Sequence, residues 1–315
     1  MRSHNRYSGH RLLLLLGMLM SMAFHGHCVG NDSPSHRQQL FGEDKLDRTY
    51  RRLLPLEGGS NFRDMGGYLT TSGQRVKRGL LFRSGAPTSL TEADMAYLSR
   101  FGFQTAVDLR SNEERALFPN HWVDADQSID YRYVDYSIMG MMKRMEGEGT
   151  RPPIAMMYGR LPEQIAPQLR VYFDALLAER TPIVVNCSAG QDRTGVTAAL
   201  VLLTLGVPRA LVIEDYLLST DFRRPALEVG DVDLEASSQT NDFAKLMLAY
   251  KQSGVTTRAN PLVTEEGTAY LEFALNQIEH DYGSVDAYLM RTVGLSEAQL
   301  ASLKVLYLED DAISR

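Results

Sequence analysis

The sequence predicts an α/β fold: a central, mostly parallel sheet flanked by helices, with extra helices at the C-terminal end. Three observations carry this prediction. Short apolar runs such as Pro182–Val185 have the length of buried strands. Longer segments with helical spacing of apolar residues alternate with these runs, and the last fifty residues are helical in pattern throughout. One domain over residues 53–315 is the simplest arrangement.

The first half of this domain supplies most of the predicted strands. Thr91 to Asp94 resembles a capping box, so a helix should start there and stop at Gly102. The two glycines of 61–68 predict a turn whose backbone passes close to another group. The elements expected here are a strand at Leu53 and Leu54, a strand over 74–83, the helix after Thr91, a strand over 105–110, a short helix around Glu113, Glu114 and Arg115, and a strand over 131–135.

The second half is mainly helical around one further strand. An amphipathic helix over 162–179 precedes the strand 182–185, and a buried helix over 196–205 follows it. The remaining expected elements are a helix over 208–219, short helices within 221–263, and a helical tail over 264–282, 285–293 and 296–308.

The N-terminus has the pattern of a signal peptide over residues 1–30. Three arginines precede an apolar core over 12–24 that is short for a membrane span. The protein is therefore expected to be exported, to a periplasm or to the medium. Acylation of Cys28 as a lipoprotein is the weaker interpretation, and an uncleaved anchor is the other alternative. Residues 31–52 are polar and predict a loose leader.

Residues 137–160 form an unusual insertion, with six of the chain's 14 methionines. Methionine side chains adapt to irregular apolar surfaces. Two interpretations stay open: a mobile lid that meets apolar substrate or a membrane surface, and an insertion that packs on the core.

Charge and cysteine content restrict the function. The net charge of −6 argues against a nucleic-acid partner. The chain has two cysteines, and cleavage after Gly30 would leave Cys187 as the single thiol of the exported protein. A lone cysteine cannot form an internal disulfide, which suits a nucleophile.

The stretch from Cys187 to Thr194 predicts phosphate chemistry. It lies between the strand 182–185 and the helix 196–205, where successive backbone N–H groups and the helix dipole attract a phosphate dianion. Arg193 can hold two phosphoryl oxygens with its planar fork. Cys187 lies where a thiolate is favoured, as a nucleophile requires. The expected phosphate-binding residues are Ser188, Ala189, Gly190, Gln191, Asp192 and Arg193.

Two further roles follow from the same chemistry. The hydroxyl of Thr194 can donate to the sulfur when the phospho-enzyme is hydrolysed, with Ser188 as the alternative donor. The leaving group needs an acid. Asp192, inside the loop, is favoured over Asp135, which ends a strand before the insertion. The weaker candidates, better explained as ion-pair partners, are Asp64, Asp108 and Asp174.

Several segments together resemble the atypical tyrosine-phosphatase family of secreted bacterial dual- and triple-specificity enzymes. The resemblance covers about residues 55–308 and runs through 61–67, 83–85, 108–111, 187–195, 215–219 and 282–289. It implies a cysteine-phosphatase fold, hydrolysis of phosphotyrosine and of other phosphomonoesters, and neither a metal nor another cofactor. It also implies that Cys187 is the nucleophile, Arg193 the phosphate clamp and Asp192 the acid.

Two positions depart from the family's pattern. Asn186 stands where the family usually has histidine, and Gln191 stands where it usually has lysine. The loop is therefore less positive than usual, which weakens the case for highly phosphorylated lipids and leaves monophosphates open.

The predicted function is a cysteine-dependent phosphatase that acts on phosphorylated protein. The alternatives are a lipid phosphatase, motivated by export and the methionine-rich insertion, and a phosphate-binding module with little turnover, motivated by Asn186 and Gln191. A sulfurtransferase typically has a loop one residue shorter.

Overall fold

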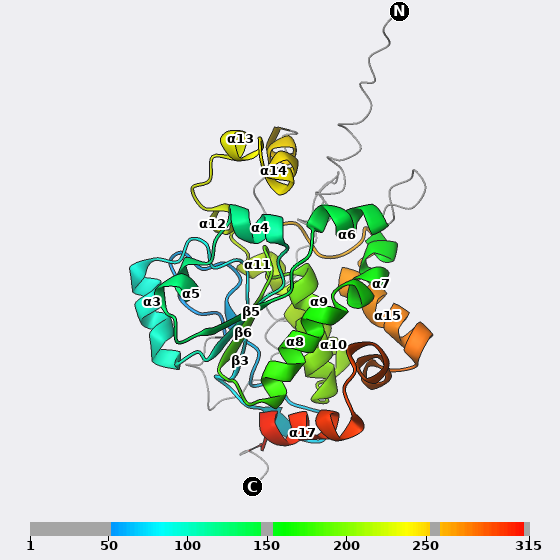
Figure 1. The fold of residues 1–315 in the computed structure, drawn as a ribbon. Coiled ribbons are helices and arrows are strands. Elements are labelled where there is room, and N and C mark those ends of the chain that lie inside the picture. Colours follow the sequence, from blue (N-terminus) through cyan, green and yellow to red (C-terminus); the bar gives the residue numbers. More distant parts are fainter. Residues whose placement is uncertain (1–51, 146–153, 253–258, 312–315) are drawn as a thin grey trace, which may run out of the picture.

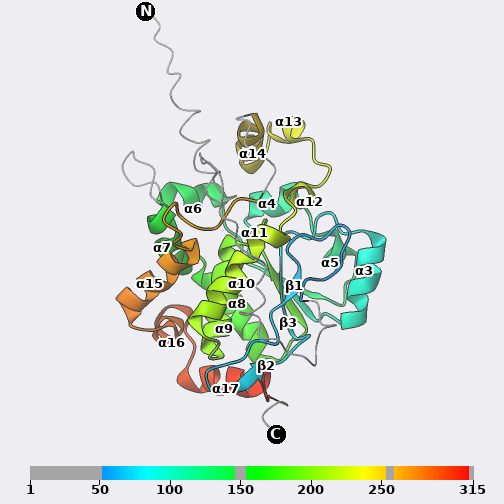
Figure 2. The same cartoon turned by 180° about the vertical axis from the view of Figure 1, so that it is seen from behind.

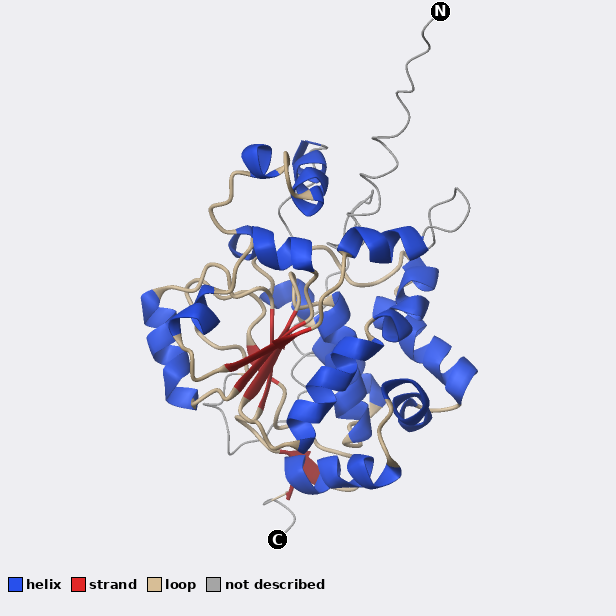
Figure 3. Cartoon of the chain, in the orientation of Figure 1, coloured by secondary structure: helices blue, strands red, loops and turns tan. Residues whose placement is uncertain are grey.

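A five-stranded sheet forms the centre of the computed structural model, which describes residues 52–145, 154–252 and 259–311. Strand β1 is antiparallel to β3, and the other neighbours are parallel, as predicted. In spatial order the strands are β1 (Arg63–Asp64), β3 (Leu81–Ser84), β6 (Ile183–Asn186), β4 (Thr105–Asp108) and β5 (Asp130–Tyr133). Figure 3 shows these strands crossing the middle of the molecule. The parallel register places Asn186 beside both Ser84 and Asp108, so three strands end at one edge.

Helices cover both faces of this sheet (Figures 1 and 2). Alternate residues of β6 face opposite sides, as the pleat requires. Val185 packs in the larger apolar cluster with α8 (Ala166–Leu177) and α9 (Asp192–Thr204). Val184 packs in a second cluster under α3 (Glu92–Leu98) and α5 (His121–Ala125). The buried strand predicted over 182–185 is therefore apolar because both of its faces are covered.

The remaining helices extend the fold beyond the two layers. They are η1 (Ser99–Phe101), α4 (Asn112–Leu117), α6 (Ile138–Met145), α7 (Ile154–Gln164), α10 (Arg209–Leu217), α11 (Ser219–Phe222), α12 (Pro225–Val229), α13 (Leu234–Ser237), α14 (Asp242–Gln252), α15 (Tyr270–Tyr282), α16 (Val285–Tyr288), η2 (Leu289–Val293) and α17 (Glu297–Tyr307). No helix in the described ranges is long and apolar enough to cross a membrane.

Three predicted elements differ from the structure. Leu53 forms only an isolated bridge with Arg63, and the strand in that region is β1. The strand predicted over 74–83 is two strands, because β2 (Gln74–Val76) pairs with β7 (Leu308–Asp310) in a separate sheet. The helix predicted over 162–179 is the end of α7 followed by α8. The capping box at Thr91 and Asp94 is confirmed.

The methionine-rich insertion contributes to a smaller apolar cluster at one end of the molecule. Met141, Met142 and Met157 are buried there with Phe118 and Phe243, beneath α14, which lies above α4 in Figure 1. These methionines therefore pack, and the lid hypothesis stays a prediction. The predicted signal peptide, Cys28 and the leader up to residue 51 lie outside the described residues.

Candidate active site

The loop from Cys187 to Gln191 joins the central strand β6 to the N-terminus of α9. Cys187 is buried and directly follows the strand. Helix α9 begins at Asp192, so the first turn of the helix points its N–H groups and its positive dipole end at the loop. This is the edge where β3, β4 and β6 end, the usual position of a ligand in an open α/β sheet.

Three successive loop carbonyls are turned towards the protein behind the loop. The carbonyls of Ser188, Ala189 and Gly190 accept from Ala86 N, Asn61 Nδ2 and Arg83 Nη2, at 2.9, 3.2 and 2.8 Å. In a planar trans peptide the C=O and the following N–H point in opposite directions. The N–H groups that follow these carbonyls therefore point away from the supporting residues and share one side of the loop, which is the geometry of an anion nest.

Gly190 shows why this loop requires glycine. Its φ is +66°, and a Cβ there would lie 2.4 Å from the backbone of Ser84. Gly195, in the first turn of α9, would place a Cβ 2.8 Å from the ring of Tyr216. The two glycines therefore let the loop curl against β3 and let α9 pack against α10.

A buried ionic cluster supports the loop from behind. Asp215 pairs with Arg83 and with Arg63, at 3.2 Å for the Nε of Arg63. The two arginine charges, and hydrogen bonds from Arg63, hold the pKa of Asp215 well below its ordinary value despite its burial. Burial, together with the neighbouring Arg83 charge, lowers the pKa of Arg63 to about 10. Arg63 also donates to the side chain of Asn61. The Asp215 carboxylate therefore holds Arg83 directly and Asn61 through Arg63, and these are the two side chains that bind loop carbonyls.

Arg193 is held by Glu114 of α4. Its Nη1 and Nη2 donate to the two Glu114 oxygens at 2.7 and 2.6 Å, and Nη1 also donates to the hydroxyl of Tyr136. The Nε of Arg193 is buried and has no hydrogen-bond partner among the described residues. The guanidinium is thus fixed in orientation, and its Nε–H and the second N–H of Nη2 are available for two phosphoryl oxygens.

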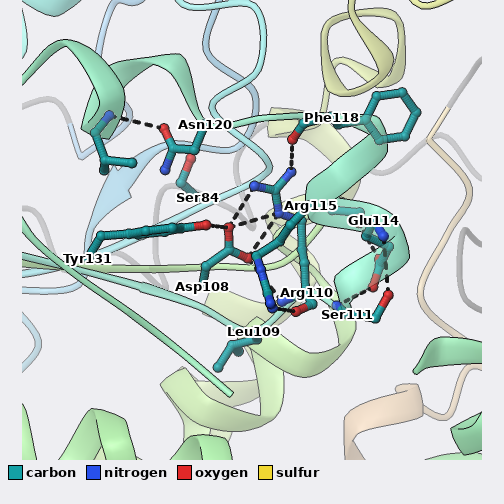
Figure 4. Close-up of polar contacts among 12 residues, drawn as sticks. Ser84, Asp108, Leu109, Arg110, Ser111, Glu114, Arg115, Phe118, Asn120 and Tyr131 are labelled. Carbon is teal, nitrogen blue, oxygen red and sulfur yellow. Dashed lines mark hydrogen bonds and ion pairs between the residues drawn. The ribbon is translucent and has the colours of Figure 1, made fainter. Parts of the chain in front are cut away.

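Glu114 is itself fixed by the start of α4. Ser111 and Glu114 form a reciprocal capping box, seen in Figure 4 beside the Asp108–Arg110 pair. Burial raises the pKa of Glu114, but the charge and hydrogen bonds of Arg193 outweigh it and lower the pKa to about 2. Glu114 is therefore an anion that holds both the clamp and, through its other contact, the hydroxyl of Ser188.

Asp192, the favoured acid, is buried at the start of α9. Its Oδ1 accepts from the hydroxyl of Tyr158, which is 2.6 Å from the hydroxyl of Tyr216. Gln191 Nε2 lies 3.3 Å from the same oxygen. Burial raises the pKa of Asp192, opposed by the Tyr158 hydrogen bond and by the more distant charge of Arg223. A raised pKa keeps a carboxyl protonated closer to neutral pH, as an acid catalyst requires.

The structure does not bring Asp135 to the loop in the same way. Its side chain is 72% exposed and pairs with Arg115 at 2.7 Å. The weaker candidates have structural partners: Asp108 pairs with Arg110, Asp174 with Arg170, and Asp64 accepts backbone N–H groups.

The two hydroxyl candidates differ in their surroundings. Ser188 Oγ donates to Glu114, whereas the buried Thr194 Oγ1 has no hydrogen-bond partner among the described residues. The Thr194 hydroxyl therefore has no competing acceptor in the described part of the chain, and its role as donor to the sulfur stays a prediction. The two positions that depart from the family's pattern differ in the same way. The Asn186 amide nitrogen is buried without a partner in the described part of the chain, whereas Gln191 accepts from Arg223 at 2.6 Å.

Sequence reasoning did not assign roles to Glu114, Tyr158 or Arg223. The capping box from Ser111 to Glu114 is visible in the sequence, but its contact with Arg193 joins two segments far apart in the chain. Nothing local marks Tyr158 or Arg223, because each meets the loop only through the fold.

Comparison with known proteins gives consistent matches over this region. Residues 54–309 match the model of the tyrosine phosphatase family. A Cupriavidus necator protein with the name of a tyrosine-protein phosphatase is 30% identical over 259 residues, covering 79% of this chain and 87% of the relative. The triple specificity protein phosphatase PtpB of Mycobacterium tuberculosis is 27% identical over 282 residues, covering 79% of this chain and 96% of the relative. Among solved structures, the core catalytic domain of the PP-IP phosphatase SIW14 from S. cerevisiae matches with a TM-score of 0.31 and 15% identity, covering 65% of this chain and 99% of that chain.

Proposed function

The chain belongs to the tyrosine phosphatase family of phosphoric monoester hydrolases. We propose that it hydrolyses phosphotyrosine residues of proteins through a phospho-enzyme intermediate on Cys187. The observation that carries the mechanism is the orientation of the loop peptides. Their carbonyls are bound from behind by Asn61 and Arg83, and their N–H groups face the side where a phosphate would lie above the buried thiol.

The first step transfers the phosphoryl group to sulfur. The Cys187 thiolate attacks phosphorus, the S–P bond forms, and the P–O bond to the leaving group breaks. The leaving oxygen takes a proton from the Asp192 carboxyl, while Arg193 and the loop N–H groups hold the equatorial oxygens.

The second step releases phosphate. Water attacks phosphorus and gives a proton to the Asp192 carboxylate, and the S–P bond breaks. Thr194 donates to the departing sulfur, which eases the return of the thiolate.

Hydrolysis of p-nitrophenyl phosphate by the wild type, Cys187→Ser and Asp192→Asn tests this mechanism. Cys187→Ser should abolish turnover and prevent covalent labelling of the protein by a ³²P-phosphorylated substrate in rapidly quenched, denatured samples. Wild-type activity in Cys187→Ser would rule out the mechanism. A wild type that binds phosphate but shows no turnover would favour the binding-module alternative.

The substrate range is tested in parallel. The M. tuberculosis relative has the name of a triple specificity phosphatase, and by that likeness we extend the proposal to phosphoserine and phosphothreonine peptides. Rates on these peptides should be measurable and lower than on phosphotyrosine peptides. Phosphoinositides in anionic vesicles form the control arm. A higher kcat/KM on vesicles than on any peptide would replace the protein substrate with a lipid and would indicate membrane contact through the insertion.

Export is proposed for the same protein. The support is the three arginines followed by the apolar run over 12–24. Fractionation of cells that express the full chain should place it outside the cytoplasm, and deletion of residues 1–30 should retain it inside. Equal distribution of the two forms would rule out the signal peptide.

A further inference from the structure

A chain of hydrogen bonds ends at the Asp192 carboxyl. Ser60 Oγ donates to Glu228 Oε1 at 2.7 Å, and Glu228 receives the Nε and Nη2 of Arg223 at 3.0 and 2.7 Å. Arg223 Nη1 then donates to Gln191 Oε1 at 2.6 Å. The Gln191 amide nitrogen lies 3.3 and 3.4 Å from the two oxygens of Asp192.

The chemistry of the side chains fixes which group donates and which accepts at each of these hydrogen bonds. An arginine side chain only donates, so Gln191 must present its oxygen to Arg223 and therefore its NH₂ group to Asp192. Lysine at position 191 would offer no acceptor to Arg223 and would place a second cation against it. The neutral residue in the loop is thus the one that fits Arg223.

The series of hydrogen bonds from Glu228 to Asp192 is rigid because its side chains are buried and held at both ends. Gln191, Arg223 and Glu228 are each exposed by 6% or less. The segment that carries Arg223, between α11 and α12, is tied to the segment before β1: Asn61 N donates to Phe222 O at 3.0 Å. That same Asn61 binds the loop carbonyls, so Arg223 and the loop have a common support.

Charge explains why arginine is tolerated in this place. Burial penalises the cation, but the Glu228 charge and hydrogen bonds more than compensate, so the pKa of Arg223 is raised. A bidentate arginine–carboxylate pair also orients the remaining nitrogen, Nη1, which a lysine ammonium cannot do.

We propose that Arg223, oriented by Glu228, is a positioning residue that aims the Asp192 acid at the leaving group through Gln191. The inference rests on the proposed role of Asp192 as the acid. An acid that protonates the leaving group matters most for poor leaving groups, because good leaving groups depart as anions. Disturbing Arg223 should therefore change the dependence of the rate on the leaving group, and not only the rate.

The test compares kcat/KM on p-nitrophenyl phosphate and on phenyl phosphate, whose leaving group is the poorer. Arg223→Gln should lose about 10-fold more on phenyl phosphate than on p-nitrophenyl phosphate, a fraction of the ~10²–10⁴-fold worth of an acid catalyst. Asp192→Asn should show the same selective loss more strongly. The double variant should lose no more than Asp192→Asn alone, because both changes remove one function.

Arg224→Gln is the matched control. The Arg224 side chain binds the carbonyls of Leu56, Glu57 and Gly59 and has no hydrogen bond to the loop in the described structure. Arg224→Gln should change kcat/KM on the two substrates by the same factor. Gln191→Met, which keeps the length of the side chain and removes both hydrogen bonds, provides the same test should Arg223→Gln fail to fold.

Equal losses on the two substrates in Arg223→Gln and Gln191→Met, with a selective loss in Asp192→Asn, would overturn the positioning role and leave the proposed function intact. The absence of a selective loss in Asp192→Asn would overturn the acid assignment itself, and the positioning role with it. Persistent turnover in Cys187→Ser would instead reject the proposed mechanism as a whole.

Discussion

Glu114 binds Arg193 through two parallel hydrogen bonds, 2.7 Å from Oε2 to Nη1 and 2.6 Å from Oε1 to Nη2. This is the bidentate geometry in which a carboxylate best orients a guanidinium. Both side chains are buried, with 1% and 5% of their surface exposed. The position of the Arg193 side chain, in α9 after β6, is therefore set by α4, the helix that follows β4.

Glu114→Gln should reduce activity by disordering the clamp. The variant leaves the buried Arg193 charge without its anion, which costs about 3–5 kcal/mol when one partner of a buried pair is removed. We expect kcat/KM on p-nitrophenyl phosphate to fall by about 10- to 70-fold if half of that cost reaches the transition state. Glu113→Gln, in the same first turn of α4, is the control and should retain most activity. Similar losses in both variants would contradict the specific role of Glu114.

Acid should destabilise the wild type through the same pair. The pKa of Glu114 is about 2 in the folded protein and 4.5 ordinarily, so its contribution is complete above about pH 4.5 and is lost as the pH falls towards 2. The span corresponds to at most about 3 kcal/mol. Urea unfolding from pH 7 to pH 2.5 should show the free-energy difference between wild type and Glu114→Gln shrinking below pH 4.5. A constant difference across this range would show that Glu114 is not the titrating group.

Tyr158→Phe should move the alkaline limb of the pH–activity profile upwards. The hydroxyl of Tyr158 donates to Asp192 and so lowers the pKa of that carboxyl. Without it the pKa of Asp192 rises further, and the acid stays protonated to higher pH. Tyr270→Phe is the control, because it also removes a tyrosine hydroxyl while the ring, whose centroid lies 5.6 Å from that of Tyr158, is retained. A limb that moves to lower pH would contradict the assignment of Asp192.

Gly190→Ala should abolish phosphate binding at a high cost in stability. The new Cβ would have to displace the backbone of Ser84 as well as adopt a φ of +66°. Gly102→Ala is closely matched, with a φ of +65° and no atom within 4 Å of the new Cβ. The control should lose only about 1–2 kcal/mol for its backbone conformation. Thermal unfolding with and without vanadate measures both effects, and equal losses would show that Ser84 does not confine the loop.

The loop, its strand and its helix could be predicted from the sequence because each is encoded locally. The apolar run before Cys187 fills both faces of the sheet, and Gly190 and Gly195 mark close approaches. The preference for Asp192 over Asp135 stays a prediction: Asp192 is buried at the start of α9, and Asp135 lies at the surface.

The residues that position the loop could not be assigned, for physical reasons. Glu114 and Arg223 contact it across large sequence separations, and a charged residue in a short polar segment has the same pattern whether it is solvated or buried. The split of the strand predicted over 74–83 has a similar origin. Its first part is paired by β7, a partner from the far end of the domain that the local pattern does not reveal.

That pairing of β2 with β7 sets an order on how the fold is completed. Val76 is opposite Leu308, and the neighbouring Lys77 N–H donates to Tyr307 O at 2.9 Å. The small sheet can therefore close only after synthesis has reached Asp310. Until then the edge of β2 that pairs with β7 stays open, and the Lys77 N–H lacks its partner carbonyl.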